Sequence, residues 1–522
     1  MTVHSSDAVL AAKHTTLLLL PEILLSVAQL LPKRDTVACL QVCSHWRLLL
    51  EPVLWRDMNF DEQAFHSYFA SADRQTRLLP STSSIEQFAR YITRIQYRGS
   101  HSAVSLTVLP HIVRLTHLRV FHHSSKTLQS LIRRNAVTLV SIHWEEQHSS
   151  RMLSVPVPED WVHNMFSTIA DCLQLRHLAL KRTTVSEGQL APFYATLRRL
   201  RTLSLAGTCV RGFVVQDSLS LPALVSLSLL SVEINPANQF ELIASCPNLT
   251  TLGWKAPMGP ISMGSYAQIV SVKNPLIQNL DISGCECSDA LMAQVIKGSP
   301  YLSRLDATKS SFGTGCVLSV LSRLGTQLKE LDLRWCWNVA PEMISEIMVG
   351  CLGLVTFHAG DVPAQILVER PFGCLKLEVL TLSITEVGKH KKIQERVYEQ
   401  LGRLGRLRIL TLCRAELPTG RAAIESEIQR RPESDSMDLR LKYGLARLAT
   451  LVRLQELRSD GLVHKADVKE ILWMGAAWKV LRVMRGTMHK NKKKRQQLVS
   501  KLLLLRPDVA FVSLDYSLSI DP

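Results

Sequence analysis

The sequence predicts an α/β protein: a small N-terminal three-helix module followed by a solenoid with a parallel concave sheet and helices on its convex side. One observation is the helical spacing of apolar residues in 17–60. A second is the frame LxxLxL, which returns at nine intervals of about 26 residues between Leu175 and Leu407. A third is the alternation of apolar and polar residues in that frame, which has the period of a strand. Since one such repeat cannot close its own core, neighbouring repeats should stack.

Residues 17–60 form the first predicted module. Pro21 suits the first turn of a helix, Pro32 ends that helix, and a second helix is expected with Asp35 as its N-cap. A third helical segment is expected to break at Pro52. A unit of 44 residues buries too little surface to be comfortably stable alone, yet this one is crowded with Leu, Val and Trp. We therefore expect part of its apolar surface to belong to a partner.

The order of sparse residue types in this module resembles an F-box. The pattern is Leu-Pro-Glu-Ile-Leu, then Val-Cys, Trp-Arg and Leu-Trp. The resemblance implies a module that binds a Skp-type adaptor, which links it to a cullin scaffold and its RING subunit, in the role of substrate receptor of a ubiquitin ligase. The matching, adaptor-binding positions are Leu20, Pro21, Ile23, Leu24, Val42, Cys43, Trp46, Leu54 and Trp55. Each could instead serve core packing, and in so thin a bundle the two roles are compatible.

The repeated frame, seen as Leu175-x-x-Leu178-x-Leu180, resembles the cysteine-containing subclass of leucine-rich repeats. Cys285 and Cys336 stand where such repeats turn away from the strand. The resemblance implies a structural role for these thiols, as small buried side chains. Because CxxC pairs and zinc-finger spacings are missing, we expect free thiols, a reducing compartment, and neither a metal nor a cofactor.

The domain organisation follows from where these two patterns begin and end. The expected parts are a mobile tail at 1–16, the F-box at 17–60, a helical connector at 61–109, the leucine-rich-repeat solenoid at 110–485, and a basic segment with a C-terminal cap at 486–522. The connector should fix the first module rigidly against the repeats, and the cap should contain a strand within 508–517. The basic run at 489–495 fits a nuclear import signal or a nucleic-acid contact, although a solvated helix start is the favoured interpretation. We expect a cytoplasmic or nuclear location, or both.

The residues that flank the middle leucine of the frame should face the concave surface. Three consecutive repeats place Asp281, Asp306 and Asp332 at the same outward position, so their carboxylates should form a row with a spacing of about 4.8 Å. The set of outward residues in these repeats is Asn279, Asp281, Arg304, Asp306, Glu330, Asp332 and Arg334. One hypothesis is a mostly acidic patch that reads a basic segment of a protein substrate. The alternative is that each aspartate only hydrogen-bonds locally.

Catalytic motifs do not accompany these features. The sequence lacks GxxxxGK[ST], HExxH, GxSxG and the kinase set, so we expect no catalytic residues. A net charge of +16 without an aromatic-rich platform does not favour nucleic-acid binding. The broken apolar run 17–31 is too short for a membrane span.

The leading hypothesis is therefore a non-catalytic substrate-recognition adaptor of a Skp-cullin-F-box ubiquitin ligase, with its protein substrate on the concave face of the repeats. One alternative is a scaffold that binds a Skp-type adaptor without cullin. Another is a basic, nucleic-acid-associated repeat protein.

Overall fold

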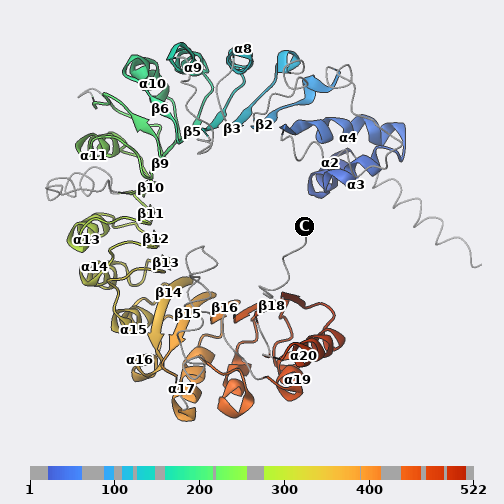
Figure 1. Cartoon of the computed structure of the whole chain (residues 1–522), viewed down its shortest axis with the longest axis vertical. Coiled ribbons are helices and arrows are strands. Elements are labelled where there is room, and N and C mark those ends of the chain that lie inside the picture. The colour runs from blue at the N-terminus through green and yellow to red at the C-terminus, as the bar shows by residue number, and fades with distance from the viewer. Residues whose placement is uncertain are drawn as a thin grey trace, which may run out of the picture. The chain divides into compact units, whose positions relative to one another are not determined.

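The structure of the chain is a computed structural model, drawn in Figure 1. The chain divides into two compact units, Met1–Asn238 (unit 1) and Gln239–Pro522 (unit 2). The residues that the structure describes are 21–60, 87–98, 109–121, 126–146, 159–215, 219–255, 276–387, 390–412, 437–459, 466–486, 489 and 491–512. The expected tail at 1–16 lies outside them.

Unit 1 begins with the three predicted helices, α2 (Pro21–Leu30), α3 (Lys33–Cys39) and α4 (Ser44–Arg56). Pro21 is the first helical residue, as its missing N–H allows. The expected cap of the second helix was wrong, because Pro32 is the N-cap of α3 and Asp35 lies in the first turn. The expected break at Pro52 was also wrong, because α4 continues through it. Proline removes the bond to the carbonyl of Leu48, a residue on the exposed side of the helix, where water can replace it.

The remainder of unit 1 is a parallel sheet with helices on one face (Figure 1). Its strands in spatial order are β1 (Asp57–Phe60), β2 (Arg94–Arg98), β3 (His117–Phe121), β4 (Ser141–Glu145), β5 (His177–Lys181), β7 (Thr202–Ala206) and β9 (Ser226–Leu229). The short strands β6 (Thr184–Val185) and β8 (Cys209–Val210) pair separately. Helical segments in this part are η1 (Ala89–Tyr91), η2 (Leu109–His111), α8 (Lys126–Arg134), α9 (Glu159–Ala170), η3 (Glu187–Gln189) and α10 (Leu190–Leu197).

Unit 2 repeats the same arrangement. Its parallel strands are β10 (Thr251–Trp254), β11 (Asn279–Asp281), β12 (Arg304–Asp306), β13 (Glu330–Asp332), β14 (Thr356–Pro363), β15 (Val379–Thr385), β16 (Ile409–Leu412), β17 (Glu456–Ser459), β18 (Val483–Gly486) and β19 (Ala510–Val512). Its helices are α13 (Asp289–Lys297), α14 (Thr314–Leu324), α15 (Pro341–Gly350), α16 (Ala364–Glu369), α17 (Lys391–Gly402), η5 (Leu441–Tyr443), η6 (Leu445–Thr450), α19 (Val468–Ala477) and α20 (Lys492–Leu505). Helix α11 (Pro236–Ala244) includes the last residues of unit 1 and the first of unit 2.

The LxxLxL frame explains the core of both units. Its leucines are buried, as Leu178 and Leu203 in unit 1 and Leu305 and Leu331 in unit 2 show, while the residues between them lie on the open face of the sheet. We call that open face, opposite the helices, the concave face. The predicted α/β solenoid is confirmed.

The sheet begins earlier than the repeat pattern predicted. Strand β2 lies at Arg94–Arg98, inside the range expected as a helical connector, and pairs with β1, which directly follows α4. Residues 61–86 of that range lie outside the described residues. At the other end of the chain, β19 falls within the region where a final strand was expected.

Cysteines pack into the core beside the frame leucines. Cys172, Cys246 and Cys351 are fully buried, and the thiol of Cys246 donates to the carbonyl of Leu242 at 3.1 Å. Burial raises the pKa of each of these three thiols to about 12. A buried, protonated thiol is a poor nucleophile and a poor metal ligand, which fits a structural role.

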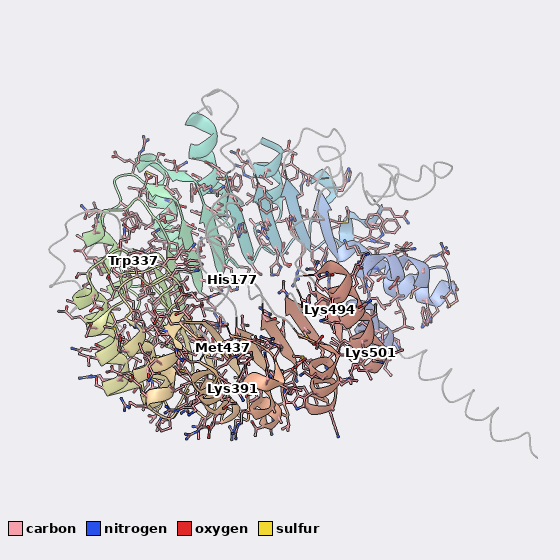
Figure 2. The ribbon with its side chains drawn as sticks, turned by 60° about the horizontal axis from the view of Figure 1, so that its bottom comes forward. His177, Trp337, Lys391, Met437, Lys494 and Lys501 are labelled. Atoms are coloured by element: carbon pink, nitrogen blue, oxygen red, sulfur yellow. The ribbon has the colours of Figure 1, made fainter. Side chains whose placement is uncertain are left out.

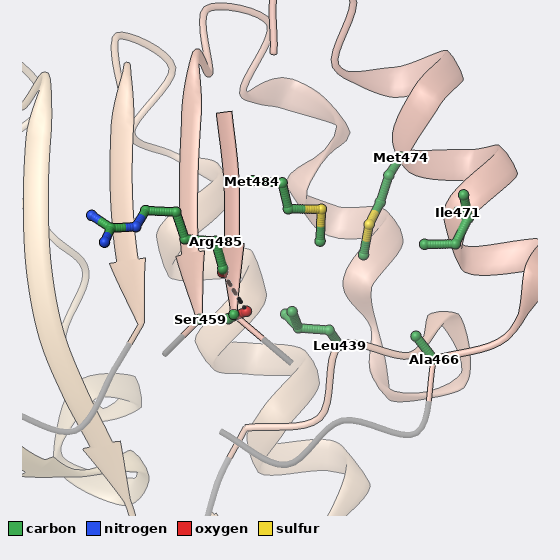
Figure 3. A pocket seen from close by; sticks show the side chains of 8 residues that line it. Leu439, Ser459, Ala466, Ile471, Met474, Met484 and Arg485 are labelled. Atoms are coloured by element: carbon green, nitrogen blue, oxygen red, sulfur yellow. Dashed lines mark hydrogen bonds between the residues drawn. The ribbon is translucent and has the colours of Figure 1, made fainter. Parts of the chain in front are cut away.

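A small pocket in unit 2 also belongs to this packing (Figure 3). Leu439, Met474 and Met484 are among the side chains that line it, while the Arg485 side chain points away from them. Its lining is almost entirely apolar, so it offers few groups that could fix a polar ligand. We interpret it as a small packing gap between neighbouring repeats.

Candidate docking surface on the N-terminal helices

Helix α2 carries two apolar stripes, and the module covers only one of them. Leu24 and Ala28 are 5% and 4% exposed and pack against Leu50 of α4. Ile23, Val27 and Leu30 follow the i, i+4, i+7 spacing of a second stripe, about 100° further round the helix. These three side chains are exposed, Leu30 at 86%.

The other two helices add to this uncovered apolar surface. Val37 of α3, Val42 just after it and Leu48 of α4 are exposed, Leu48 at 73%. We call the set the exposed apolar set: Ile23, Val27, Leu30, Val37, Val42 and Leu48. A surface of this kind on a small helical module is the usual mark of a protein interface.

The C-terminal end of α4 is fixed to the first strands of unit 1. The Trp55 ring stacks on Phe88 with centroids 4.9 Å apart and planes 10° from parallel. The Thr93 N–H donates to the carbonyl of Arg56 at 3.0 Å, and Lys33 Nζ donates to the carbonyl of Asp57. Burial lowers the pKa of Lys33, which Asp57 partly offsets. The helical module therefore continues into the sheet without a flexible joint at this point.

The predicted adaptor-binding residues differ in how far they are exposed to solvent. Leu20 lies outside the described residues. Leu24 is core, whereas Ile23, Val42 and Cys43 are exposed. The half-buried positions are Pro21, Trp46, Leu54 and Trp55.

Four exposed apolar residues of the module lie outside the F-box pattern. They are Val27, Leu30, Val37 and Leu48. For Val27 and Leu30, the signal was present in the helical spacing, which makes α2 apolar over a wider arc than a single neighbour can cover.

The acidic row on the concave face of unit 2 forms as the frame requires. Strand register places Asp281 beside Asp306 and Asp306 beside Asp332. Each carboxylate accepts the backbone N–H two residues further on, at 2.9 Å from Ser283, and at 3.0 Å from both Thr308 and Arg334. These bonds close the turn that ends each strand, as the local interpretation expected.

The turns themselves are alike in the three repeats. Gly284, Lys309 and Trp335 occupy the same position and all have φ near +60°, at 64°, 57° and 65°. Two of the three are not glycine, so the conformation must be held by its surroundings. The aspartate bonds are one such restraint.

Several other residues of the predicted concave set form ion pairs. Arg304 Nε lies 2.7 Å from Glu330 Oε2, and Arg334 contacts Asp332 through Nε and Nη2, the latter at 2.7 Å. The Asn279 amide donates to Thr251 Oγ1 at 3.1 Å. Four carboxylates face two guanidinium groups, so the surface keeps an acidic excess alongside its structural role.

Within the described ranges, His, Cys, Asp and Glu residues do not gather into a group of three that could hold a metal ion. Among the described helices, none has both the length and the apolar character needed to cross a membrane.

Comparison with known proteins identifies the first module. The F-box-like family matches residues 20–61, which include all three helices. F-box domains generally bind Skp-type adaptors, and F-box and leucine-rich-repeat modules are generally non-catalytic interaction modules. No curated protein matches the chain significantly.

Two solved structures resemble the chain at low identity. A leucine-rich-repeat protein of Leptospira interrogans aligns over 82% of this chain and 98% of its own, at 14% identity and a TM-score of 0.38. TLR13, in its complex with ssRNA13, aligns over 76% of this chain and 62% of its own, at 12% identity and a TM-score of 0.38. On the family match and on its own repeated parallel strands, the chain carries an F-box-like domain at residues 20–61, followed by a parallel leucine-rich-repeat sheet.

Proposed function

We propose that this protein is a non-catalytic substrate-recognition subunit of a Skp-cullin-F-box ubiquitin ligase. The observation that carries the proposal is the exposed apolar set on an F-box-like module whose described core holds only Leu24, Ala28 and Leu50. A Skp-type adaptor would cover those side chains and complete the interior of the module. Through the adaptor, the chain would reach a cullin and its RING subunit.

In this role the chain would promote ubiquitin transfer by placing the substrate, without taking part in the chemistry. The repeats hold a protein substrate on their concave face, and the complex raises the effective concentration of a substrate lysine at the ubiquitin-conjugating enzyme. The continuous path from α4 into β1 and β2 supports this, because a rigid connection preserves the reach between adaptor and substrate. The reacting bond need not touch any residue of this chain.

The test is recovery of partners with the full-length chain. Purified chain should capture a Skp-type adaptor, and the adaptor-bound chain should capture a cullin. The double variant Leu30→Ser and Leu48→Ser should lose the adaptor. Leu504→Ser, on α20 and exposed at 75%, is the matched control and should retain it.

The outcomes separate three functions. Capture of adaptor and cullin supports the ligase subunit. Adaptor without cullin supports the scaffold that was the first alternative. Salt-sensitive capture of nucleic acid without adaptor supports the second alternative and contradicts the proposal.

A further inference from the structure

Cationic and histidine side chains gather on the concave face of four neighbouring strands in unit 1, β2 to β5. Register pairs Arg94 with His117 in one row, and Arg119 with His143 in the next. His177 lies in the first row, two strands beyond His117, on the concave side (Figure 2). With a strand spacing of about 4.8 Å, these five residues, the basic patch, occupy a width of about 15 Å.

Two carboxylates, Glu145 and Asp57, lie beside the basic patch on the same face of the sheet, and each is close to a cationic side chain. The Glu145 side chain is 9% exposed and lies 2.7 Å from Lys181 Nζ and 3.8 Å from His143 Nε2. Asp57, on the neighbouring strand β1, lies 3.7 Å from Arg94. The exposed guanidinium groups of Arg94 and Arg119 are therefore the charged groups that a ligand on this face would meet first.

The pKa values of two histidines show that positive charges lie close to them. Burial lowers the pKa of His117, the charges of Arg94 and His177 lower it further, and the charge of Asp57 partly offsets them. Burial likewise lowers the pKa of His143, with Arg119 as the next cause, and Glu145 partly offsets both. Cations lower a histidine pKa by repelling its protonated form, so an anion bound here would raise the pKa of both histidines.

We propose that the basic patch binds an acidic segment of the protein substrate. This inference rests on the proposed function, because it names the substrate chemistry that one part of the repeat surface selects. Charge complementarity with Arg94 and Arg119 indicates an acidic occupant, and the small residues Ser141 and Ala179 beside the histidines leave room for an extended backbone. The acidic row of unit 2 would not attract the same segment.

A peptide fits this surface better than a nucleic acid does. Single-stranded nucleic acids are held by aromatic rings on which bases stack. The Phe121 ring on β3 is only 5% exposed, and the Arg119 guanidinium covers it at 4.6 Å. Trp144 of β4 points into the core and is fully buried.

The test is fluorescence anisotropy with the full-length chain in complex with its Skp-type adaptor. The probe is a labelled 12-residue peptide of alternating Glu and Ser, compared with versions in which Gln or Lys replaces Glu, and with a labelled oligo-dT of equal length. The Glu peptide should bind at least about tenfold more tightly than the Gln and Lys peptides, and its affinity should fall as salt rises. The double variant Arg119→Gln and His177→Gln should lose about tenfold in affinity, and Arg119→Lys should retain most of it.

The control variant is Arg323→Gln, an exposed arginine in the last turn of α14 in unit 2, which should change nothing. Equal binding of the Glu and Gln peptides would overturn the inference, as would unchanged affinity in the double variant. Preference for the oligonucleotide would assign the patch to nucleic acid instead. Because the adaptor is present in the same preparation, a failure here leaves the proposed adaptor function intact.

Discussion

Asp289 offers a sharp test of how neighbouring repeats are joined. Its carboxylate lies in the first turn of α13 but caps the next helix, α14, which has no side-chain cap of its own. Oδ1 accepts the N–H groups of Gly313 at 2.8 Å and Cys316 at 3.1 Å, and Oδ2 accepts that of Gly315 at 2.6 Å. Burial acts to raise the pKa of Asp289, but the hydrogen bonds it receives outweigh burial and hold the pKa below its ordinary value.

The expected loss for Asp289→Ala follows from these contacts. Loss of an N-cap costs about 0.5–2 kcal/mol. Three donors lose a charged acceptor at once, and each such bond contributes roughly 1.5–3 kcal/mol when considered alone. Because the carboxylate is half-exposed and water can replace part of the set, we expect a loss of about 2 kcal/mol in the opening free energy of α14. Asp289→Asn should lose less.

Hydrogen exchange of the α14 amides measures this directly, since a chain of stacked repeats opens locally before it unfolds globally. Glu286→Ala, an exposed change in the same repeat, is the control and should leave the exchange unaltered. Gly315→Ala gives a second test, because its Cβ would lie 2.9 Å from Asp289 Oδ2. In the Asp289→Ala background it should cost less than it does in the unmodified chain. A change below about 0.5 kcal/mol for Asp289→Ala would refute the capping role.

Three further outcomes are expected. Leu50→Ala should destabilise the helical module by about 2–5 kcal/mol as a buried truncation, whereas Leu48→Ala should not, which thermal unfolding of the two variants can compare. Trp55→Ala should remove the stacking on Phe88 and increase amide exchange in β1 while leaving β13 unchanged. Burial lowers the pKa of His358, so this residue costs the fold nothing above pH about 6.5 and destabilises it as the pH falls from there to its lower folded pKa. His358→Gln should therefore flatten the stability profile between pH 7 and 5, and an unchanged slope would contradict this.

Much of the fold was open to prediction from the sequence because the repeat frame encodes it. Leucines at a fixed spacing, such as Leu305 and Leu331, can only be inward residues of neighbouring parallel strands. The helical stripe of α2 was visible for the same reason, since the period of a pattern reports its structure. The contacts that join one repeat to the next could not be predicted from the sequence. Asp289 and Gly315 are 26 positions apart and come together only when the helices stack.

The candidate docking surface, like the fold, could be predicted from the sequence only in part. The F-box pattern located the module, but it could not separate Leu24, which is core, from Ile23, which is exposed. That distinction depends on which side of α2 the other helices cover. The basic patch was missed because its residues lie on four strands and come together only through register, with no motif in the chain to connect Arg94 with His177.

Hydrogen exchange of residues 21–56 in the full-length chain, with and without a Skp-type adaptor, tests the central proposal most directly. Adaptor binding should slow exchange throughout α2, α3 and α4 and leave the strands of unit 2 unchanged, because the partner completes the interior of the module. Exchange that is already slow in the free chain, and unaltered by saturating adaptor, would contradict the proposal.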